Sequence, residues 1–158
     1  MKKRHVGLDT NCLIQALPSK SIFHKIWEDF MEGKYILCVS NEILNEYEEI
    51  ITRYSSARVA KNVVDAIAHS PHTLYKESYF KFHLIIQDPD DNKFVDCALA
   101  SNAEYIVSED SHFKCLEHIP FPKLTSPVRF NATITVGIRI SCIIIPGIAF
   151  KNAPAINA

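Results

Sequence analysis

Short apolar runs alternate along this chain with longer segments whose apolar residues recur at helical spacing. The short runs have the length and composition of buried strands, and the longer segments have the stripe of an amphipathic helix. Strands that alternate with helices favour a parallel sheet covered by helices. The sequence therefore predicts an α/β fold with a mostly parallel central sheet of about five strands. These strands are expected at residues 4–8, 35–39, 82–86, 105–107 and, more weakly, 123–125.

The helical segments carry recognisable start and stop signals. Gly33 can adopt the left-handed conformation that ends a helix, and Ser40 is a residue type that caps a helix start. Asp88 followed by Pro89 combines a capping side chain with a proline at the first helical position. Helices are expected at residues 22–31, 40–54, 57–68 and 88–102.

The last part of the chain follows a different pattern. From Ala132 to Cys142 apolar and polar residues alternate strictly, which predicts a half-buried strand that pairs at a sheet edge or with another subunit. At 158 residues the chain is long enough for one well-packed domain. We expect this domain to span residues 4–130, followed by an apolar C-terminal β extension at 131–158.

Composition limits the cellular setting and the partners. The net charge of -1 gives no general positive field, so a polyanionic substrate would need local basic residues or bound cations. No apolar run approaches the roughly 18 residues of a membrane span, and the first residues lead into a strand rather than a signal-peptide core. The five cysteines form no C-x-x-C pair, which favours reduced thiols. We therefore expect a cytoplasmic protein without a membrane segment.

Acidic residues follow the predicted strands. Asp9, Asp91 and Asp110 each come shortly after a strand, and Glu46 lies in the second turn of the helix that follows strand 35–39. Ligands of an open parallel sheet bind beyond the carboxyl ends of its strands, so these acids should meet at one edge. No basic residue is placed to neutralise them, and the cluster therefore predicts a metal ion. The alternative is that each acid only caps a helix or complements its dipole.

Helical periodicity distinguishes the acids at residues 88–96 from one another. At about 100° per residue, Asp91 lies in the apolar stripe of its helix, where a carboxylate needs a partner. Asp96 points about 140° away from Asp91 and is expected to face solvent. Asp88 is expected to be the helix cap, and Asp90 to complement the helix dipole.

Other polar positions allow two interpretations. Glu46 and Glu48 flank the apolar stripe of their helix on opposite sides, so spacing alone does not choose between them. Asn11 and Ser108 each lie two residues from one of the strand-end acids, where a short polar side chain could hold a carboxylate or a metal-bound water. Each could equally serve only its local turn.

Four segments that carry these acids follow one another along the chain. They are Leu8-Asp9-Thr10-Asn11-Cys12-Leu13-Ile14, Ser40 to Glu46, Asp88-Pro89-Asp90-Asp91-Asn92-Lys93-Phe94 with Ala98, and Tyr105-Ile106-Val107-Ser108-Glu109-Asp110 with Phe113. In this order they resemble the PIN-domain ribonucleases, and most closely the branch of toxin components from toxin–antitoxin pairs. The resemblance covers residues 4–130. It assigns the acids of the family to Asp9, Glu46, Asp91 and Asp110, and so selects Glu46 over Glu48. Asn11 and Ser108 occupy the family's supporting polar positions.

The resemblance implies endonucleolytic cleavage of RNA with Mg²⁺ or Mn²⁺ as cofactor. Mg²⁺ prefers oxygen ligands, which suits a site built from Asp and Glu. Asp9 and Asp110 are expected to be direct ligands, with Asp91 and Glu46 holding metal-bound waters or a second ion. In-line attack would leave 5′-phosphate and 3′-hydroxyl ends. Besides RNA, the expected partners are an antitoxin protein and a second copy of the chain in a dimer.

Two other functions stay open. A magnesium-dependent phosphatase of the haloacid-dehalogenase type would need a second Asp two residues after Asp9, where this chain has Asn11. A catalytically inactive PIN-like binding module would keep its acids only as helix caps. Added Mg²⁺ or Mn²⁺ would stabilise a metal site and leave caps unaffected.

Overall fold

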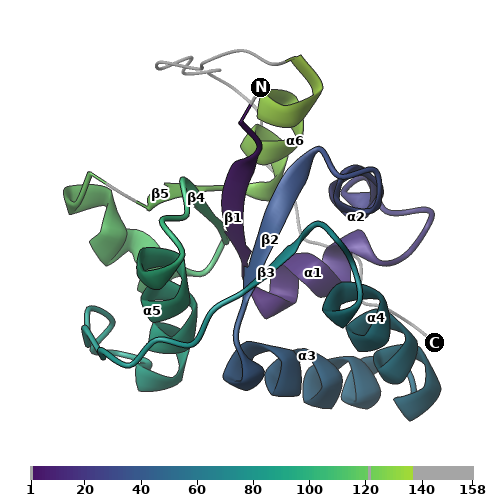
Figure 1. The fold of residues 1–158 in the computed structure, drawn as a ribbon, viewed down its shortest axis with the longest axis horizontal. Coiled ribbons are helices and arrows are strands. Elements are labelled where there is room, and N and C mark those ends of the chain that lie inside the picture. Colours follow the sequence, from purple (N-terminus) through teal and green to yellow (C-terminus); the bar gives the residue numbers. More distant parts are fainter. Residues whose placement is uncertain (1, 121, 137–158) are drawn as a thin grey trace.

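The structure of the protein is a computed structural model that describes residues 2–120 and 122–136. Its centre is one parallel sheet with strand order β3-β2-β1-β4-β5 (Figure 1). The predicted α/β class is confirmed, and so are four of the five predicted strands. The strands are β1 (Arg4–Leu8), β2 (Tyr35–Val39), β3 (Thr73–Tyr75), β4 (Tyr105–Val107) and β5 (Lys123–Thr125).

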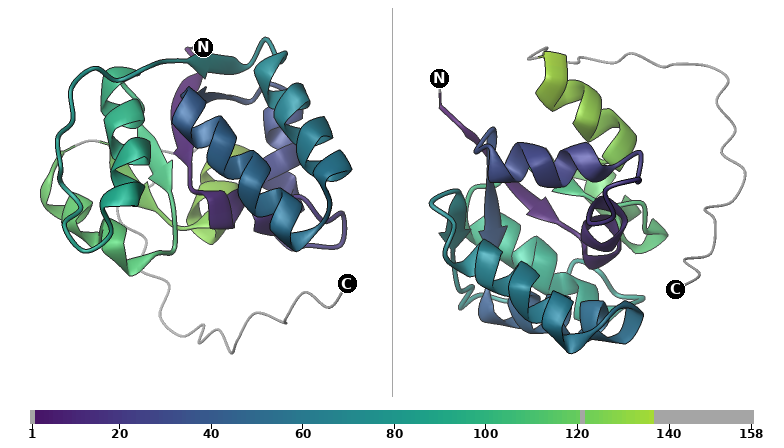
Figure 2. Two further views of the ribbon diagram at one scale, coloured as in Figure 1. Left: turned by 90° about the horizontal axis from the view of Figure 1, so that it is seen from below. Right: turned by 90° about the vertical axis from the view of Figure 1, so that its right-hand side faces the viewer.

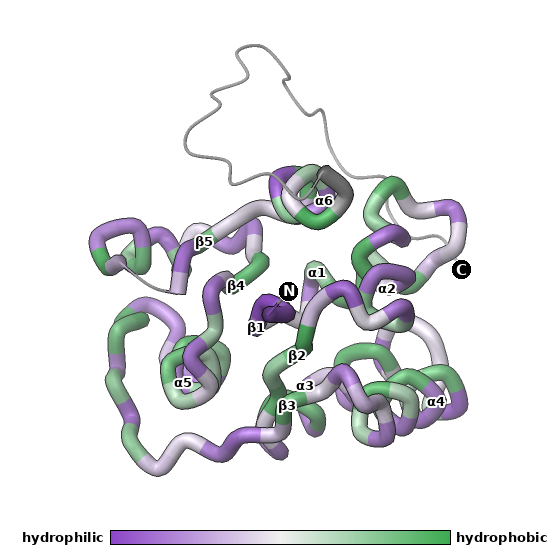
Figure 3. Tube along the Cα trace, turned by 45° about the horizontal axis from the view of Figure 1, so that its top comes forward, coloured by the Kyte–Doolittle hydropathy of each residue, from purple (hydrophilic) through white to green (hydrophobic). Residues whose placement is uncertain are grey.

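Helices cover both faces of this sheet. α5 lies on one face, and α1, α2 and α6 lie on the other (Figure 3). α3 and α4 run side by side, and α3 lies beyond the carboxyl end of β2 (Figures 1 and 2). The helices are α1 (Thr10–Ala16), α2 (His24–Met31), α3 (Asn41–Tyr54), α4 (Ala57–Ala68), the 3₁₀ helix η1 (Pro89–Asp91), α5 (Asn92–Ala100), the 3₁₀ helix η2 (Ser111–His118) and α6 (Pro127–Val136).

The predicted helix signals act as expected at three places. Gly33 has a φ of 71° and lies two residues after the end of α2. The Ser40 hydroxyl accepts a hydrogen bond from the Ile43 N–H at 3.3 Å and caps α3. The Asp88 carboxylate accepts from the Asp90 N–H at 3.2 Å, so Asp88 caps the short turn η1 that leads into α5.

The strand order reverses at β1, and this reversal positions the site. The chain builds β1, β2 and β3 outward in one direction and then returns to place β4 and β5 on the other side of β1. Leu8 and Val107 therefore pair as neighbours at the carboxyl ends of β1 and β4, and the Asp9 N–H donates to the Val107 carbonyl at 3.0 Å. This is the topological switch point at which open α/β sheets bind ligands.

A chain of buried aromatic rings joins three elements near this switch point. Phe94 of α5 lies with its ring centroid 6.5 Å from that of Tyr47 on α3 and 6.3 Å from that of Phe113 on η2. All three rings are at most 1% exposed. Aromatic pairs at such distances contribute about 0.5–1.5 kcal/mol each beyond burial. The rings therefore hold α3, α5 and η2 in fixed relation.

The strand predicted at residues 82–86 is wrong, because side chains satisfy the backbone there instead of a neighbouring strand. Asn92 accepts from the Ile85 N–H at 2.9 Å and donates to the Ile85 carbonyl at 2.7 Å. Asp96 accepts from the Phe82 N–H at 3.0 Å, and His83 has a φ of 51°, which breaks an extended chain. The third strand is instead the short segment β3, whose three residues carry too little pattern to be recognised.

The strand predicted from Ala132 is also wrong for residues 132–136, which belong to α6. The hydroxyl of Ser126 accepts from the Arg129 N–H at 3.4 Å, and a proline follows Ser126, so this segment begins as a capped helix. Thr133 is buried and Ala132 exposed, the reverse of the alternation expected for a strand. The rest of the predicted strand, at 137–142, and most of the predicted extension lie outside the described residues.

Across the described part of the chain, no helix combines the length and the apolar character that crossing a bilayer requires. Within residues 2–120 and 122–136, four cysteines are free thiols: Cys12, Cys38 and Cys97, which are buried, and Cys115, which is exposed.

Candidate functional site

Asp9 lies at the end of β1, immediately before α1, and its carboxylate does not cap that helix. Asp9 is 4% exposed. Its Oδ2 accepts a hydrogen bond from the Ser108 hydroxyl at 2.9 Å, across the β1–β4 junction. The Tyr47 hydroxyl donates to the Leu8 carbonyl and so braces the backbone just before Asp9. The helix-cap interpretation fails for Asp9, because α1 receives no side-chain hydrogen bond at this position.

Ser108 joins the two strand ends at the switch point. Besides donating to Asp9, its hydroxyl oxygen accepts from the Asp110 N–H at 3.0 Å. Asp110 in turn caps η2, with its Oδ1 accepting from the His112 N–H at 2.9 Å. Ser108 is 4% exposed, so both of its hydrogen bonds lie in a buried setting. The expectation that Ser108 holds a carboxylate agrees with this geometry.

Glu46 reaches the same edge from the second turn of α3. Its Oε1 accepts from the Thr10 hydroxyl at 2.5 Å, and its Oε2 forms an ion pair with the Lys93 ammonium. Glu48 is exposed. The structure thus brings Glu46, and not Glu48, to the site. It also corrects the expectation that no basic residue neutralises the cluster, because Lys93 neutralises Glu46.

Asp91 lies between η1 and α5, and its carboxylate makes no cap hydrogen bond to α5. Its Oδ2 is 3.2 Å from His112 Nδ1. The same nitrogen is 3.3 Å from Asp110 Oδ1 and 3.9 Å from Asp88 Oδ2. His112 therefore stands among three carboxylates that come from two segments about twenty residues apart in the sequence.

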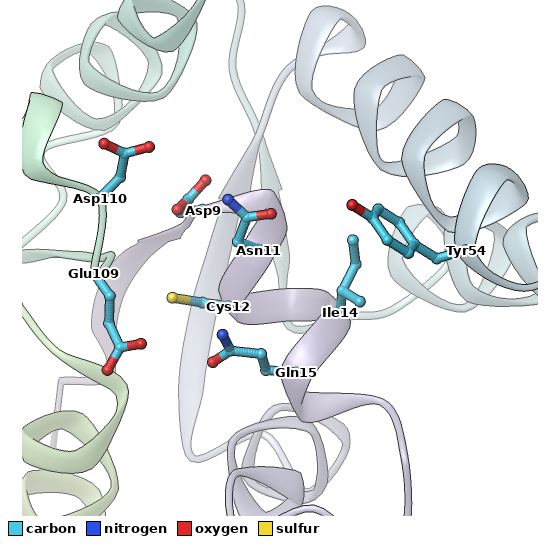
Figure 4. Close-up of a pocket in the computed structure, with 8 residues that line it drawn as sticks. All are labelled: Asp9, Asn11, Cys12, Ile14, Gln15, Tyr54, Glu109 and Asp110. Atoms are coloured by element: carbon cyan, nitrogen blue, oxygen red, sulfur yellow. The ribbon is translucent and has the colours of Figure 1, made fainter. Parts of the chain in front are cut away.

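A pocket of about 340 Å³ opens beside the acids of β1 and β4 (Figure 4). Figure 4 shows the Asp9 and Asp110 carboxylates on the same side of it, with the Asn11 amide next to Asp9 and the Glu109 carboxylate turned the other way. The Tyr54 hydroxyl points into the pocket from α3. The lining residues are Asp9, Asn11, Cys12, Ile14, Gln15, Tyr54, Glu109 and Asp110.

The electrostatics of the cluster favour a cation. Burial raises the pKa of Asp9 to about 6, the Ser108 hydrogen bond opposes this shift, and the charges of Asp91, Asp110 and Glu46 add to it. Burial also raises the pKa of Asp91, and the neighbouring charges of Asp88 and Asp110 raise it further, against a lowering contribution from His112. Buried like charges favour protonation unless a cation takes the place of the proton.

Among the described residues, neither Lys nor Arg forms an ion pair with Asp9, Asp91 or Asp110. These three carboxylates are oxygen ligands of the kind that Mg²⁺ and Mn²⁺ prefer. Both oxygens of Glu46 already have partners, so Glu46 is the acid least available as a direct ligand. The donor set therefore fits a hard divalent ion.

Asp96 is 1% exposed, so the expectation that it faces solvent is wrong. The angular count from Asp91 assumed one regular helix, but Asp91 lies where η1 passes into α5, and the buried region of α5 is wide. Asp96 lies away from the cluster, where it binds the Phe82 N–H. Asp90 is exposed, as expected for a residue that only complements the helix start.

Sequence reasoning did not place three residues beside the acids: Thr10, Lys93 and His112. Thr10 and Lys93 each lie within a segment that carries an acid, but their contacts with Glu46 span 36 and 47 residues of sequence. His112 follows Asp110 by two residues, a spacing that resembles the Asn11 and Ser108 positions and could have marked it. Asn11 is exposed and lines the pocket.

Comparisons with known proteins agree with this geometry. The family model for the PIN domain matches residues 5–112. No curated protein is similar enough to the chain to count as a match. Among solved structures, the chain resembles one from the crystal structure of VapBC2 from Rickettsia felis bound to a DNA fragment from their promoter. The TM-score is 0.55 and the identity 14%, over 77% of this chain and 98% of that one.

The structural resemblance shows the fold alone, and the family match spans more than half of the chain. The matched residues include the segments that carry Asp9, Glu46, Asp91 and Asp110. This chain belongs to the PIN-domain family.

Proposed function

We propose that this chain is a Mg²⁺- or Mn²⁺-dependent endoribonuclease and the toxin of a toxin–antitoxin pair. The observation that carries the proposal is the convergence of Asp9, Asp91 and Asp110 at the switch point without Lys or Arg partners among the described residues. Membership in the PIN-domain family supports a nuclease.

Asp9 and Asp110 are the proposed direct ligands, because they flank the pocket at the adjoining ends of β1 and β4. Asp91 and Glu46 are proposed to hold metal-bound waters or a second ion. Ser108 orients Asp9 by donating to its Oδ2, which leaves the other carboxylate oxygen of Asp9 available. Asn11, beside Asp9 in the pocket, can hydrogen-bond a ligand water or a phosphate oxygen.

A divalent ion bound there would lower the pKa of an attacking water and stabilise negative charge on the phosphate and on the leaving oxygen. The chain's own contribution is to fix the carboxylates through Ser108, Thr10 and the buried rings. Lys93, held at the edge of the cluster by Glu46, is positioned to contact a phosphate of the substrate. In-line hydrolysis would leave 5′-phosphate and 3′-hydroxyl ends.

The partner proposals rest on resemblance. The similar solved structure is of VapBC2, and its description places that protein on a DNA fragment from a promoter. We propose by analogy that an antitoxin binds this chain and covers the acidic pocket, and that two copies of the chain associate in the cytoplasm. An antitoxin that contributes a basic side chain would meet carboxylates that lack a Lys or Arg partner in the described part of the chain.

The direct test is to incubate the purified chain with a pool of RNA, with Mg²⁺ or with a chelator, and to sequence the ends of the products. We expect cleavage only with the metal, and a loss on the order of a hundredfold or more in Asp9→Asn, the scale typical of removing one charge-stabilising group. Asp90→Asn, which changes an exposed acid beside the cluster, is the matched control and should cleave normally. Cleavage that persists in chelator or in Asp9→Asn would refute the proposal.

A further inference from the structure

His112 occupies an unusual place in an otherwise acidic site. Its Nδ1 lies 3.2 Å from Asp91 Oδ2, 3.3 Å from Asp110 Oδ1 and 3.9 Å from Asp88 Oδ2. Its own N–H donates to Asp110 Oδ1 at 2.9 Å, so the backbone of η2 fixes that oxygen relative to the ring. The His112 side chain is 31% exposed, compared with 17% for Asp91 and 45% for Asp88.

These separations match the spacing of ligands around one metal ion. Two ligand atoms at right angles, each about 2.1–2.2 Å from an ion, are roughly 3.0–3.1 Å apart, and opposite ligands are roughly 4.3 Å apart. The two short distances from Nδ1 fit adjacent positions, and the 3.9 Å distance falls between the two limits. One atom from each of Asp88, Asp91 and His112 lies within 4.8 Å of the others.

The chemistry of the ring also fits this role. A neutral imidazole offers a lone pair on the nitrogen that faces the acids once its proton sits on the other nitrogen. Nδ1 is the atom aimed at the carboxylates, and His112 also lines a hollow of about 290 Å³, together with Gln87 and Lys114 among others.

We propose that His112, together with Asp88 and Asp91, binds a second divalent ion through its ring nitrogen, and that this position therefore prefers Mn²⁺ to Mg²⁺. Carboxylates alone serve both ions, but imidazole nitrogen suits transition metals, and Mg²⁺ keeps to oxygen ligands. The imidazole nitrogen therefore favours Mn²⁺ over Mg²⁺, whereas a site made only of carboxylates would not. The inference rests on the metal-binding part of the proposed function and not on RNA as the substrate.

Pulsed electron paramagnetic resonance of the full chain loaded with Mn²⁺ tests the ligand directly. We expect nitrogen coupling to the bound Mn²⁺ in the wild type, and a change in that coupling when the histidines carry ¹⁵N, which needs no substitution. The coupling should disappear in His112→Ala. It should persist in His118→Ala, which removes an exposed histidine from the end of the same 3₁₀ helix.

Competition between the two metals tests the preference. In His112→Ala the dissociation constant for Mn²⁺ should rise by about tenfold or more, at least the loss typical of removing an outer partner of a metal ligand, while that for Mg²⁺ should change little. If Mn²⁺ binds the wild type without nitrogen coupling, His112 only hydrogen-bonds the acids and the inference is wrong, although the nuclease proposal stands. If Mg²⁺ binds and Mn²⁺ does not, the inference alone is wrong, and if neither ion binds, both proposals are wrong.

Discussion

At the scale of single residues, Asp9 shows how burial prepares a ligand. Its carboxylate is nearly inaccessible, faces three other acids and is held by one hydroxyl. In the absence of metal this arrangement opposes ionisation, which is why the pKa of Asp9 rises to about 6. A bound divalent ion would stabilise the ionised form of Asp9. The burial of Asp9 among other acids is therefore better explained by ligand binding than by a contribution to folding stability.

The first prediction concerns Asp9→Asn in the presence of a chelator. The native pKa, about 6, lies above the ordinary value of 3.8, so the native state binds the proton more tightly and loses stability as pH rises from about 4 to about 6. Asp9→Asn removes this loss and should raise the free energy of unfolding at neutral pH by about 1–3 kcal/mol. The gain should vanish below about pH 4.

Urea unfolding across this pH range measures the effect, with Asp90→Asn as the control. A variant that is less stable than the wild type at neutral pH in chelator would mean that the charge of Asp9 already has a stabilising partner. A gain that persists at low pH would assign the effect to a cause other than ionisation.

Ser108 gives a second prediction at this scale. Its hydrogen bond lowers the pKa of Asp9, so Ser108→Ala should raise that pKa further and increase competition between protons and metal. We expect Mg²⁺ affinity to fall by about tenfold or more at about pH 6.5 and to recover partly at about pH 8.

Isothermal titration calorimetry at the two pH values is the appropriate measurement. Ser101→Ala is a matched control, because Ser101 is a similarly buried serine whose hydroxyl donates to two carbonyls of α5 and contacts none of the acids of the site. Equal losses of Mg²⁺ affinity in the two variants would remove the specific role assigned to Ser108.

At the scale of helices and strands, the sequence was informative wherever a local signal decided the structure. β1, β2 and β4 were predicted from short runs with apolar residues, and β5, whose only apolar residue is Leu124, was predicted more weakly. The α3 start was predicted because Ser40 is a strong cap. The strand at 82–86 failed because Asn92 and Asp96, several residues further along, take its backbone hydrogen bonds. No local pattern in residues 82–86 shows that side chains from residues 92 and 96 will replace a neighbouring strand as hydrogen-bond partners.

The residues of the site were likewise predictable where a local signal marked them and not where their contacts depend on packing. Asp9, Glu46, Asp91 and Asp110 could be proposed from their places after predicted strands and from the family resemblance. The contact of Lys93 with Glu46 depends on how α5 packs, and no spacing in the sequence specifies it. His112 follows Asp110 by two residues, but its contact with Asp91 depends on how η2 packs. The assignment of these acids to catalysis stays a prediction.

Packing between elements gives the third prediction. Phe94 contacts the rings of Tyr47 and Phe113, each of which lies close in sequence to an acid of the site. Phe94→Leu should lower the free energy of unfolding by about 1–3 kcal/mol through the loss of two ring contacts. It should also weaken Mn²⁺ binding, since α3, α5 and η2 would no longer be held in one arrangement.

Phe30→Leu is the control for this variant. Phe30 is also 1% exposed and also contacts two rings, those of Trp27 and Tyr35, but it lies on α2 on the other side of the sheet. We expect a similar loss of stability with unchanged Mn²⁺ affinity. If both variants lost affinity equally, general loosening of the fold would explain the result.

At the scale of the whole molecule, the topology itself creates the site. Reversal of strand order at β1 brings the ends of β1 and β4 together, and the return of the chain to β4 brings η1 and α5 to the same edge. Segments about a hundred residues apart are thus brought together at the site, as the Ser108–Asp9 hydrogen bond shows with a sequence separation of 99. The central claim is that this collection of carboxylates exists to hold a divalent cation.

Calorimetric titration of Mn²⁺ into the purified chain tests that claim most directly, with Asp110→Asn and Asp90→Asn measured in parallel. The account predicts saturable binding to the wild type, binding weakened by about tenfold or more in Asp110→Asn, and no change in Asp90→Asn. Absence of binding to the wild type, or equal affinity in Asp110→Asn, would contradict it.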